Sequence, residues 1–168
     1  MSKPDWIMEA EKLIGLHESP GSIDNPIVVG LFKDAGHSEV IHDETPWCAA
    51  FVGAVLNRSN HKGNGSLWAL DYAKWGQALD DVALGAVATK KRIDNKTGKL
   101  VGGHVFFVVG WDDKHVYGLG GNQRDQVSIT EFNRSDIVAY RWPSDVPLPD
   151  QQPKFLAVTD FAAAGSEA

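Results

Sequence analysis

Residues 45–56 read TPWCAAFVGAVL, and residues 102–111 read GGHVFFVVGW. The first stretch begins with Thr45 as a helix N-cap, continues with a proline suited to the first helical position, and is then apolar throughout. It predicts a buried helix that carries Cys48 in its first turn. The second stretch is rich in β-branched and aromatic residues and predicts a buried strand over 105–111. A fold that packs helices against a sheet would bury both.

Three further helices are expected in the first half of the chain. An amphipathic pattern predicts a helix that follows Pro4 and stops at Gly15. A second helix is expected from Asn25, an N-cap followed by proline, to Gly36. Apolar and tryptophan residues predict another helical stretch over about 66–79.

After Gly85 the 3.6-residue period gives way to β-branched and aromatic runs separated by turn residues. Helices followed by strands predict an α+β fold, with N-terminal helices packed on a C-terminal antiparallel β-sheet. We expect one domain over 1–142 and a Pro-rich C-terminal arm and tail over 143–168. The expected strands lie at 86–92, 105–111, 116–120, 127–130 and 137–142.

The composition of the chain limits its partners. The 168 residues include one cysteine, so no internal disulfide can form, and the net charge is -6. This charge argues against nucleic acid or an anionic lipid surface as the main partner. The opening residues MSKPDWIMEAEKL lack the apolar segment of a signal peptide, and no apolar run approaches the roughly 20 residues of a membrane span. We expect a monomer that is made in the cytoplasm without a signal peptide and does not insert into a membrane.

Cys48 and His104 are the candidate nucleophile and base. A thiol in the first turn of a helix lies among unpaired backbone N–H groups, which favour the thiolate and can hold an oxyanion. A lone cysteine is also often a small buried hydrophobe, so both interpretations stay open. Among six histidines, His104 follows two glycines and opens a strand, where its ring can face a helix terminus.

Asn122 is the candidate for the residue that orients the histidine. A catalytic imidazole needs an acceptor for its second N–H, and Asn122 follows a glycine-rich segment at the end of the next strand. If the two strands form a hairpin, an amide at this position can hold the ring. Glycine pairs are more often simple turns, so this assignment depends on Cys48 and His104.

Three motifs together resemble a known family: DETPWCAAFVGAVL, GHVFFVVGW and GLGGNQRDQVSI. They are similar to motifs of the NlpC-like and CHAP-like cell-wall cysteine hydrolases of bacteria and phages. The resemblance spans roughly residues 4–142. It implies a papain-like α+β fold and cleavage of amide bonds in peptidoglycan peptides. It also implies Cys48 as nucleophile, His104 as base and Asn122 as the orienting residue, a position where many relatives carry histidine or an acidic residue.

Four more residues are candidates for contact with substrate. Asp43 and Glu44 immediately precede the predicted helix and can bind substrate amines or form a solvated acidic turn. Trp47 precedes the nucleophile, although its apolar neighbours also favour the core. Gln123 follows Asn122 and is expected to line the cleft. Papain carries an oxyanion glutamine six residues before its cysteine, and this chain carries His42 there, so the oxyanion partner stays open.

Metal and cofactor chemistry find weaker support in the sequence. A zinc amidase is a rival interpretation, because His37, His42, Asp43 and Cys48 lie close together and are possible zinc ligands. The chain has no His-Glu-x-x-His motif and no paired cysteines. The segment 94–98 reads DNKTG and is better suited to a turn than to a calcium loop. We expect no metal and no cofactor.

The sequence therefore predicts a cysteine peptidase or amidase that hydrolyses peptidoglycan. A phage endolysin, made in the cytoplasm and acting at the bacterial cell wall after release, is the favoured interpretation. An amidase toxin delivered between bacteria and a tail-associated hydrolase are alternatives with the same chemistry. A catalytically inactive cell-wall-binding or phage structural module is the alternative from another class.

Overall fold

The computed structural model describes residues 3–17, 25–39 and 47–158. Within these ranges the fold is α+β, as predicted, with helices in the first half and an antiparallel sheet in the second. No helix in the described ranges is long and apolar enough to cross a membrane. The helices are α1 (Asp5–Glu11), α2 (Pro26–Asp34), α3 (Cys48–Arg58) and the short 3-10 helices η1 (Ala69–Lys74) and η2 (Arg134–Asp136).

The described part of the chain forms one six-stranded sheet in the order β1-β6-β2-β3-β4-β5, and all neighbouring strands are antiparallel. The five predicted strands are confirmed. Strand β3 starts earlier than expected, because it stays paired with β2 as far as Leu100. The strands are β1 (Gln77–Ala78), β2 (Val87–Ile93), β3 (Leu100–Trp111), β4 (His115–Gln123), β5 (Gln126–Asn133) and β6 (Ile137–Trp142).

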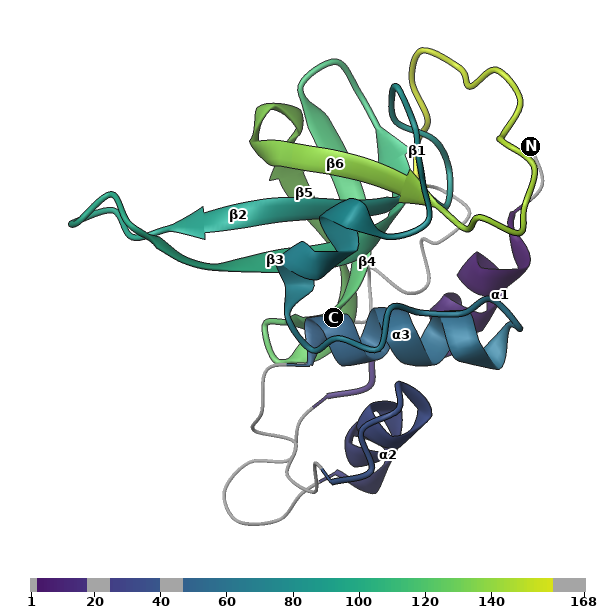
Figure 1. Ribbon diagram of the computed structural model, residues 1–168. Coiled ribbons are helices and arrows are strands. Elements are labelled where there is room, and N and C mark those ends of the chain that lie inside the picture. Colours follow the sequence, from purple (N-terminus) through teal and green to yellow (C-terminus); the bar gives the residue numbers. More distant parts are fainter. Residues whose placement is uncertain (1–2, 18–24, 40–46, 159–168) are drawn as a thin grey trace.

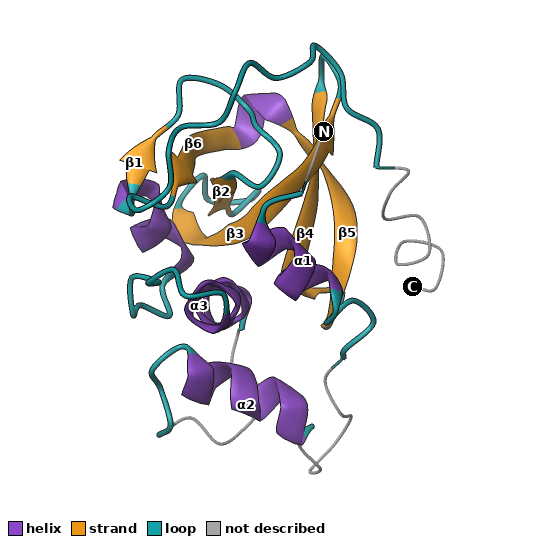
Figure 2. Ribbon diagram, turned by 90° about the vertical axis from the view of Figure 1, so that its right-hand side faces the viewer, coloured by secondary structure: helices purple, strands orange, loops and turns teal. Residues whose placement is uncertain are grey.

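Helix α3 is the centre of the packing. Seen along its axis, it lies between the sheet and α2 (Figure 2). Its apolar residues from Cys48 to Leu56 are all buried, which explains why the helix is apolar all round. Phe51 packs edge-on against Phe107 of β3, with ring centroids 6.0 Å apart. Helix α3 therefore fixes its first turn against the middle of the sheet.

Two helix predictions need correction. The stretch 66–79 forms only the short η1, because Trp75 leaves the helical conformation and Gly76 adopts a positive φ of 61°. The chain then enters β1, which pairs with β6 (Figure 1). Helix α3 begins at Cys48 with Trp47 in the N-cap position, because the Trp47 backbone is not helical. The expected N-cap, Thr45, lies outside the described residues.

The described part of the C-terminal arm packs on the domain. Trp111 and Leu156 exchange two backbone hydrogen bonds of 2.8 and 2.9 Å. The indole N–H of Trp111 also donates to the carbonyl oxygens of Pro153 and Lys154. Gln152 accepts a hydrogen bond from the Leu84 amide. The arm thus covers the end of β3 farthest from the β2–β3 hairpin.

Candidate functional site

Cys48 is the first residue of α3, and its side chain is almost completely buried, with 8% of the residue exposed. The thiol lies against backbone N–H groups of Val105 in β3 and of Cys48 and Ala49 in its own helix. Burial raises the pKa of the thiol, and these N–H groups and the positive charge of Arg92 offset only part of that effect. The resting side chain is therefore a protonated thiol at neutral pH, not the thiolate that its helix position favours.

His104 lies in β3 and is 2% exposed. Its Nε2 atom is 2.9 Å from Oε1 of Gln123. The amide nitrogen of Gln123 donates to the carbonyl oxygens of Gly118 and Ser128 and to the Thr130 hydroxyl. Because that nitrogen is the donor, Oε1 must accept, and the proton of the neutral imidazole is assigned to Nε2. The Nδ1 atom then carries a lone pair.

The Nδ1 lone pair is the unusual feature of this imidazole. Nδ1 is buried and has no hydrogen-bond partner among the described residues. Burial lowers the pKa of His104 to about 4, the bond to Gln123 opposes this shift, and the charges of Arg92 and Lys90 add to it. A buried acceptor without a donor is costly, and in a native protein it needs an explanation. Nδ1 is a neutral base that can accept a proton or a hydrogen bond.

Cys48 contacts the backbone of Val105, the residue after His104 in β3, but Nδ1 of His104 forms no hydrogen bond with it or with any other described residue. Side chains alternate along a strand, and the β2–β3 register is regular from 102 to 107. Phe107 packs on α3, so Val105 shares that face and His104 points to the other one, beside Phe106 and Phe132. The expectation that the ring faces the helix terminus is therefore not met in this structure.

The side-chain amide that contacts His104 belongs to Gln123 and not to Asn122. Asn122 adopts a positive φ of 59° in a bulge of β4 that separates Gly120 from Gln123 in the register. This bulge brings the Gln123 side chain to His104. Gln123 is buried, with 6% exposed, and it both contacts the imidazole and lines a small cavity beside His104. Asn122 is half-buried beside the same small cavity.

Of the other predicted substrate residues, only Trp47 lies in the described part of the chain. Trp47 is fully buried and packs where α3 meets Gly121 of β4, so it offers no surface to a substrate. Trp47 is therefore a core residue. Asp43 and Glu44 lie outside the described residues, as does His42.

The described residues offer no cluster of three or more histidine, cysteine, aspartate or glutamate side chains that is arranged to hold a metal ion. Of the zinc candidates, His37 contacts Glu39 through Nδ1 and the carbonyl oxygen of Gly65 through Nε2. This histidine therefore has protein partners at both nitrogens.

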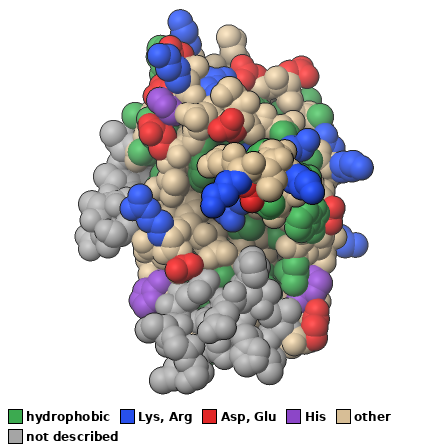
Figure 3. All heavy atoms as spheres, turned by 90° about the vertical axis from the view of Figure 1, so that its left-hand side faces the viewer, with side chains coloured by type: hydrophobic (Ala, Val, Ile, Leu, Met, Phe, Trp, Pro, Cys, Tyr) green, Lys and Arg blue, Asp and Glu red, His purple; other side chains and the backbone are tan. Residues whose placement is uncertain are grey.

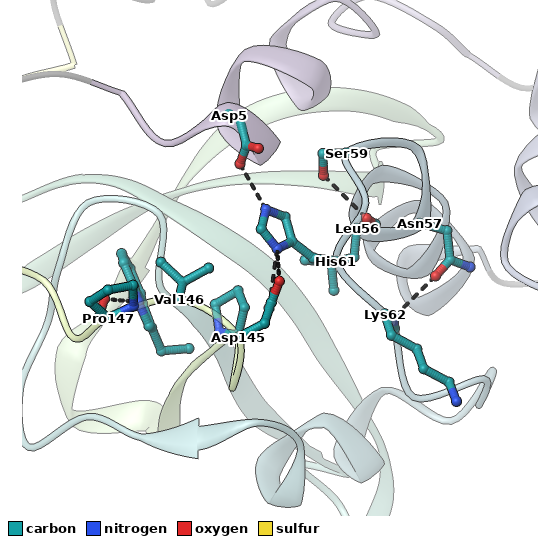
Figure 4. Close-up of polar contacts among 12 residues, drawn as sticks. Asp5, Leu56, Asn57, Ser59, His61, Lys62, Asp145, Val146 and Pro147 are labelled. Atoms are coloured by element: carbon teal, nitrogen blue, oxygen red, sulfur yellow. Dashed lines mark hydrogen bonds and ion pairs between the residues drawn. The ribbon is translucent and has the colours of Figure 1, made fainter.

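His61 is a residue whose importance sequence reasoning missed. Its ring is held between two carboxylates, with Nε2 2.9 Å from Asp5 and Nδ1 3.0 Å from Asp145 (Figure 4). Burial by itself lowers the pKa of His61, but the two carboxylates outweigh it and raise the pKa above 6.5. In the sequence His61 lies in a loop-like segment, which favours a surface histidine, and no local motif indicates a contact with residues 56 and 84 positions away.

Two cavities are relevant to function. The larger of the two, about 750 Å³, lies between the sheet end and the C-terminal arm, where Trp111, Arg134 and Phe155 are among its lining residues. Neither Cys48 nor His104 lines it. A smaller cavity of about 170 Å³ lies beside His104. Of these two cavities, only the smaller one places a ligand beside His104.

Comparison of the chain with protein-family models, with curated proteins and with solved structures gave no match.

Proposed function

We propose that the protein is a papain-like cysteine hydrolase that cleaves an amide bond of peptidoglycan peptides. One observation carries the proposal: His104 is held by the Gln123 amide with its basic Nδ1 unpartnered among the described residues, next in sequence to the Val105 amide that contacts the Cys48 sulfur. A thiol at a helix N-terminus, an imidazole and an orienting amide form the minimal set for acyl transfer by a cysteine. The three sequence motifs add peptidoglycan as the substrate.

The proposed reaction proceeds by acyl transfer to water. Nδ1 of His104 takes the thiol proton while the sulfur of Cys48 attacks the peptide carbonyl. Backbone N–H groups at the start of α3 hold the oxyanion. The imidazolium then protonates the leaving amine, and the neutral ring activates the water that releases the acyl group. Gln123 accepts the Nε2–H throughout and fixes the tautomer.

His104 points to the sheet face opposite α3 in this structure, so the reaction requires a rearrangement that brings Nδ1 and the Cys48 sulfur within hydrogen-bonding distance. Catalytic hydrogen bonds often form fully only when substrate binds. The resting pair is neutral, because the thiol pKa is raised and the imidazole pKa is about 4. The proton therefore moves during the attack and is not transferred beforehand.

The biological setting belongs to the same proposal. We favour a phage endolysin that is made in the cytoplasm and acts as a monomer, without cofactor, at the bacterial cell wall. A toxin amidase or a tail-associated hydrolase would use the same chemistry.

The second candidate is a cell-wall-binding module without chemistry. It is favoured by one observation, the lack of a hydrogen bond between Cys48 and His104 within the described contacts. A buried cysteine can be a packing residue, with 8% exposure typical of the core.

The test is release of free amines from purified peptidoglycan by wild type, Cys48→Ala and His104→Gln, with chelator in a parallel sample. His115→Gln is the matched control, because His115 is a strand histidine that pairs with Asp112 away from His104. We expect release by wild type and by the control in chelator, and none by the other two variants. Product masses identify the bond.

Equal release by Cys48→Ala would exclude the thiol mechanism. Binding to peptidoglycan without release by any form, on walls of several chemotypes, would favour the binding module. Circular dichroism and one-dimensional NMR spectra of each variant verify that the fold is kept.

A further inference from the structure

The hairpin formed by β2 and β3 projects beyond the rest of the sheet (Figure 1). Strand β2 pairs with β6 only as far as Lys90, and β3 pairs with β4 only from Phe107 onward. Between these limits the two strands pair only with each other among the described residues. We call residues 90–101 the basic hairpin. Its outer side chains are available to a partner outside the chain.

The basic hairpin concentrates positive charge. It contains five basic residues and a single acidic one, Asp94. The Asp94 carboxylate accepts the backbone N–H groups of Lys96 and Thr97, which holds it in the turn. No ion pair joins any of the five basic side chains to another described residue. The basic residues are Lys90, Lys91, Arg92, Lys96 and Lys99.

The sign of the charge on the hairpin is opposite to that of the whole chain. The net charge is -6, so all of the negative excess lies outside the basic hairpin. Seen end-on, basic side chains gather around the hairpin (Figure 3). A strand rises about 3.3 Å per residue, so residues 91–93 and the turn carry these charges beyond a Debye length of about 8 Å at physiological salt. An anionic surface that meets the hairpin first is therefore attracted by it and largely screened from the acidic remainder.

A cavity at the base of the hairpin has the same sign. It measures about 170 Å³, its lining includes Lys90, Arg92 and Arg124, and no carboxylate lines it. Lys90 also lies over the Phe132 ring, 5.4 Å from the centroid. Lysine and arginine bind phosphate oxygens through charge-assisted hydrogen bonds. The positive surface therefore extends from the turn of the hairpin to the sheet.

Exposed apolar side chains distinguish a lipid surface from other polyanions. Ile93, Leu100 and Val101 are 50%, 50% and 61% exposed, and all three lie close to the turn. Large apolar side chains exposed together mark an interaction site. A bilayer interface accommodates both kinds of side chain, because headgroup phosphates attract the cations and apolar groups enter the acyl boundary. A soluble polyanion offers nothing to the apolar groups.

We propose that the basic hairpin binds the surface of an anionic phospholipid bilayer. Its lysine and arginine side chains contact headgroup phosphates, and Ile93, Leu100 and Val101 enter the interface. Binding is peripheral, and the remainder of the protein stays in water. The net charge argues against such a partner for the chain as a whole, but the distribution of charge favours it at this hairpin. The inference goes beyond the proposed function and does not depend on it.

The experiment measures sedimentation of the full chain with vesicles made of equal parts of phosphatidylglycerol and phosphatidylcholine. Vesicles of phosphatidylcholine alone are the neutral reference. We expect partition into the anionic vesicles to be at least about tenfold stronger than into the neutral ones at about 0.1 M salt. At about 0.5 M salt the two values should converge, because the attraction is screened.

A pair of double variants tests the charges. Lys96→Gln with Lys99→Gln should weaken partition into the anionic vesicles at least about tenfold. Lys62→Gln with Lys114→Gln is the matched control, because both lysines are exposed and lie outside the hairpin. This control removes the same net charge and should retain most of the binding.

A second comparison tests the apolar side chains at constant charge. Leu100→Thr with Val101→Thr should weaken partition at least about threefold, because less apolar area enters the interface. Val138→Thr is the matched control, because Val138 is 47% exposed on β6 and lies outside the hairpin. Circular dichroism of each variant verifies that the fold is kept.

Equal partition into anionic and neutral vesicles would overturn the proposal, as would an equal loss in the two lysine double variants. Full binding by the Leu100→Thr and Val101→Thr double variant would identify a general polyanion site and would also overturn it. Cys48→Ala should bind vesicles as the wild type does. Vesicle binding and amine release are therefore tested separately, and failure of one leaves the other standing.

Discussion

His104 Nε2 and Gln123 Oε1 lie 2.9 Å apart and join β3 to β4 beyond the point where their ladder ends. The last paired residues before this bond are Phe107 and Leu119. The bulge in β4 then interrupts the regular register, and the side-chain bond replaces the missing backbone pairs. The imidazole is thereby fixed by the same amide that holds the bulge together.

Replacing Gln123 with alanine should impair both stability and activity. The variant leaves the buried Nε2–H of His104 without an acceptor, which costs about 1–3 kcal/mol. We expect the rate of amine release to fall by roughly 10²-fold, because the tautomer is no longer fixed. The ¹⁵N shifts of the imidazole report the tautomer and separate this effect from a general loss of structure.

Asn122→Gly is the matched comparison. Glycine accepts the positive φ of 59° without strain, so the bulge should be kept. We expect this variant to retain most of its activity and the wild-type tautomer. A larger loss in Asn122→Gly than in Gln123→Ala would return the orienting role to Asn122.

Cys48 should react slowly with iodoacetamide at pH 7. Burial raises the pKa of its thiol and also limits access of the reagent. Alkylation, followed by mass spectrometry, should accelerate on unfolding in guanidinium and, in the folded protein, as pH rises above the ordinary thiol pKa. Arg92→Gln should raise the thiol pKa further. Fast labelling of folded protein with an inflection below pH 8 would contradict this assignment.

The contacts of His61 with Asp5 and Asp145, here called the His61 clamp, should make the free energy of unfolding depend on pH. Although burial opposes it, the folded pKa of His61 is raised above 6.5 by Asp5 and Asp145. Its contribution is therefore complete below the unfolded pKa and is lost as pH rises through the folded pKa. Urea unfolding of wild type and His61→Gln between pH 5.5 and 8.5 should give the largest difference in unfolding free energy at the acid end. A difference that grows with pH would refute the clamp.

Two glycine substitutions should have opposite effects on the free energy of unfolding. A Cβ atom at Gly121 would lie 2.6 Å from Cβ of Phe51 and 2.8 Å from the Trp47 ring, so Gly121→Ala should destabilise the protein by about 1–3 kcal/mol. Gly30 lies in α2 with nothing within 4 Å of its added Cβ. Gly30→Ala should stabilise by roughly 0.5–1 kcal/mol through helix propensity. Thermal and urea unfolding measure both.

The strands and two of the helices could be predicted because their signals are local. Asn25 and the proline after it mark the start of α2, and the Asn25 side chain accepts the Ile27 amide as expected of an N-cap. The stretch before β1 was harder, because its tryptophans suggest a helical face although Trp75 leaves the helical conformation before Gly76. Propensity summed over the window does not reveal that break.

The amide that contacts His104 could be predicted only to within a residue. The sequence places Cys48 in the first turn of a helix, as the structure has it, and His104 at a strand start, whereas β3 already begins at Leu100. The choice between Asn122 and Gln123 depends on a bulge of one left-handed residue, and a shift of this size exchanges the faces of a strand. His104 faces away from α3 because side chains alternate between the two faces of a strand. The sequence alone does not define which residues take which face until the strand register is known.

The His61 clamp also determines when the N-terminal helix can be secured during synthesis. Its partners are Asp5 and Asp145, and Trp6 of α1 packs edge-on against Trp142, with ring centroids 5.0 Å apart. The contacts of Asp145 and Trp142 can form only after β6 and the turn that follows have been translated. Helix α1 precedes both in the chain, so on the ribosome it must wait for them before the clamp is complete. Its apolar face is meanwhile available to chaperones.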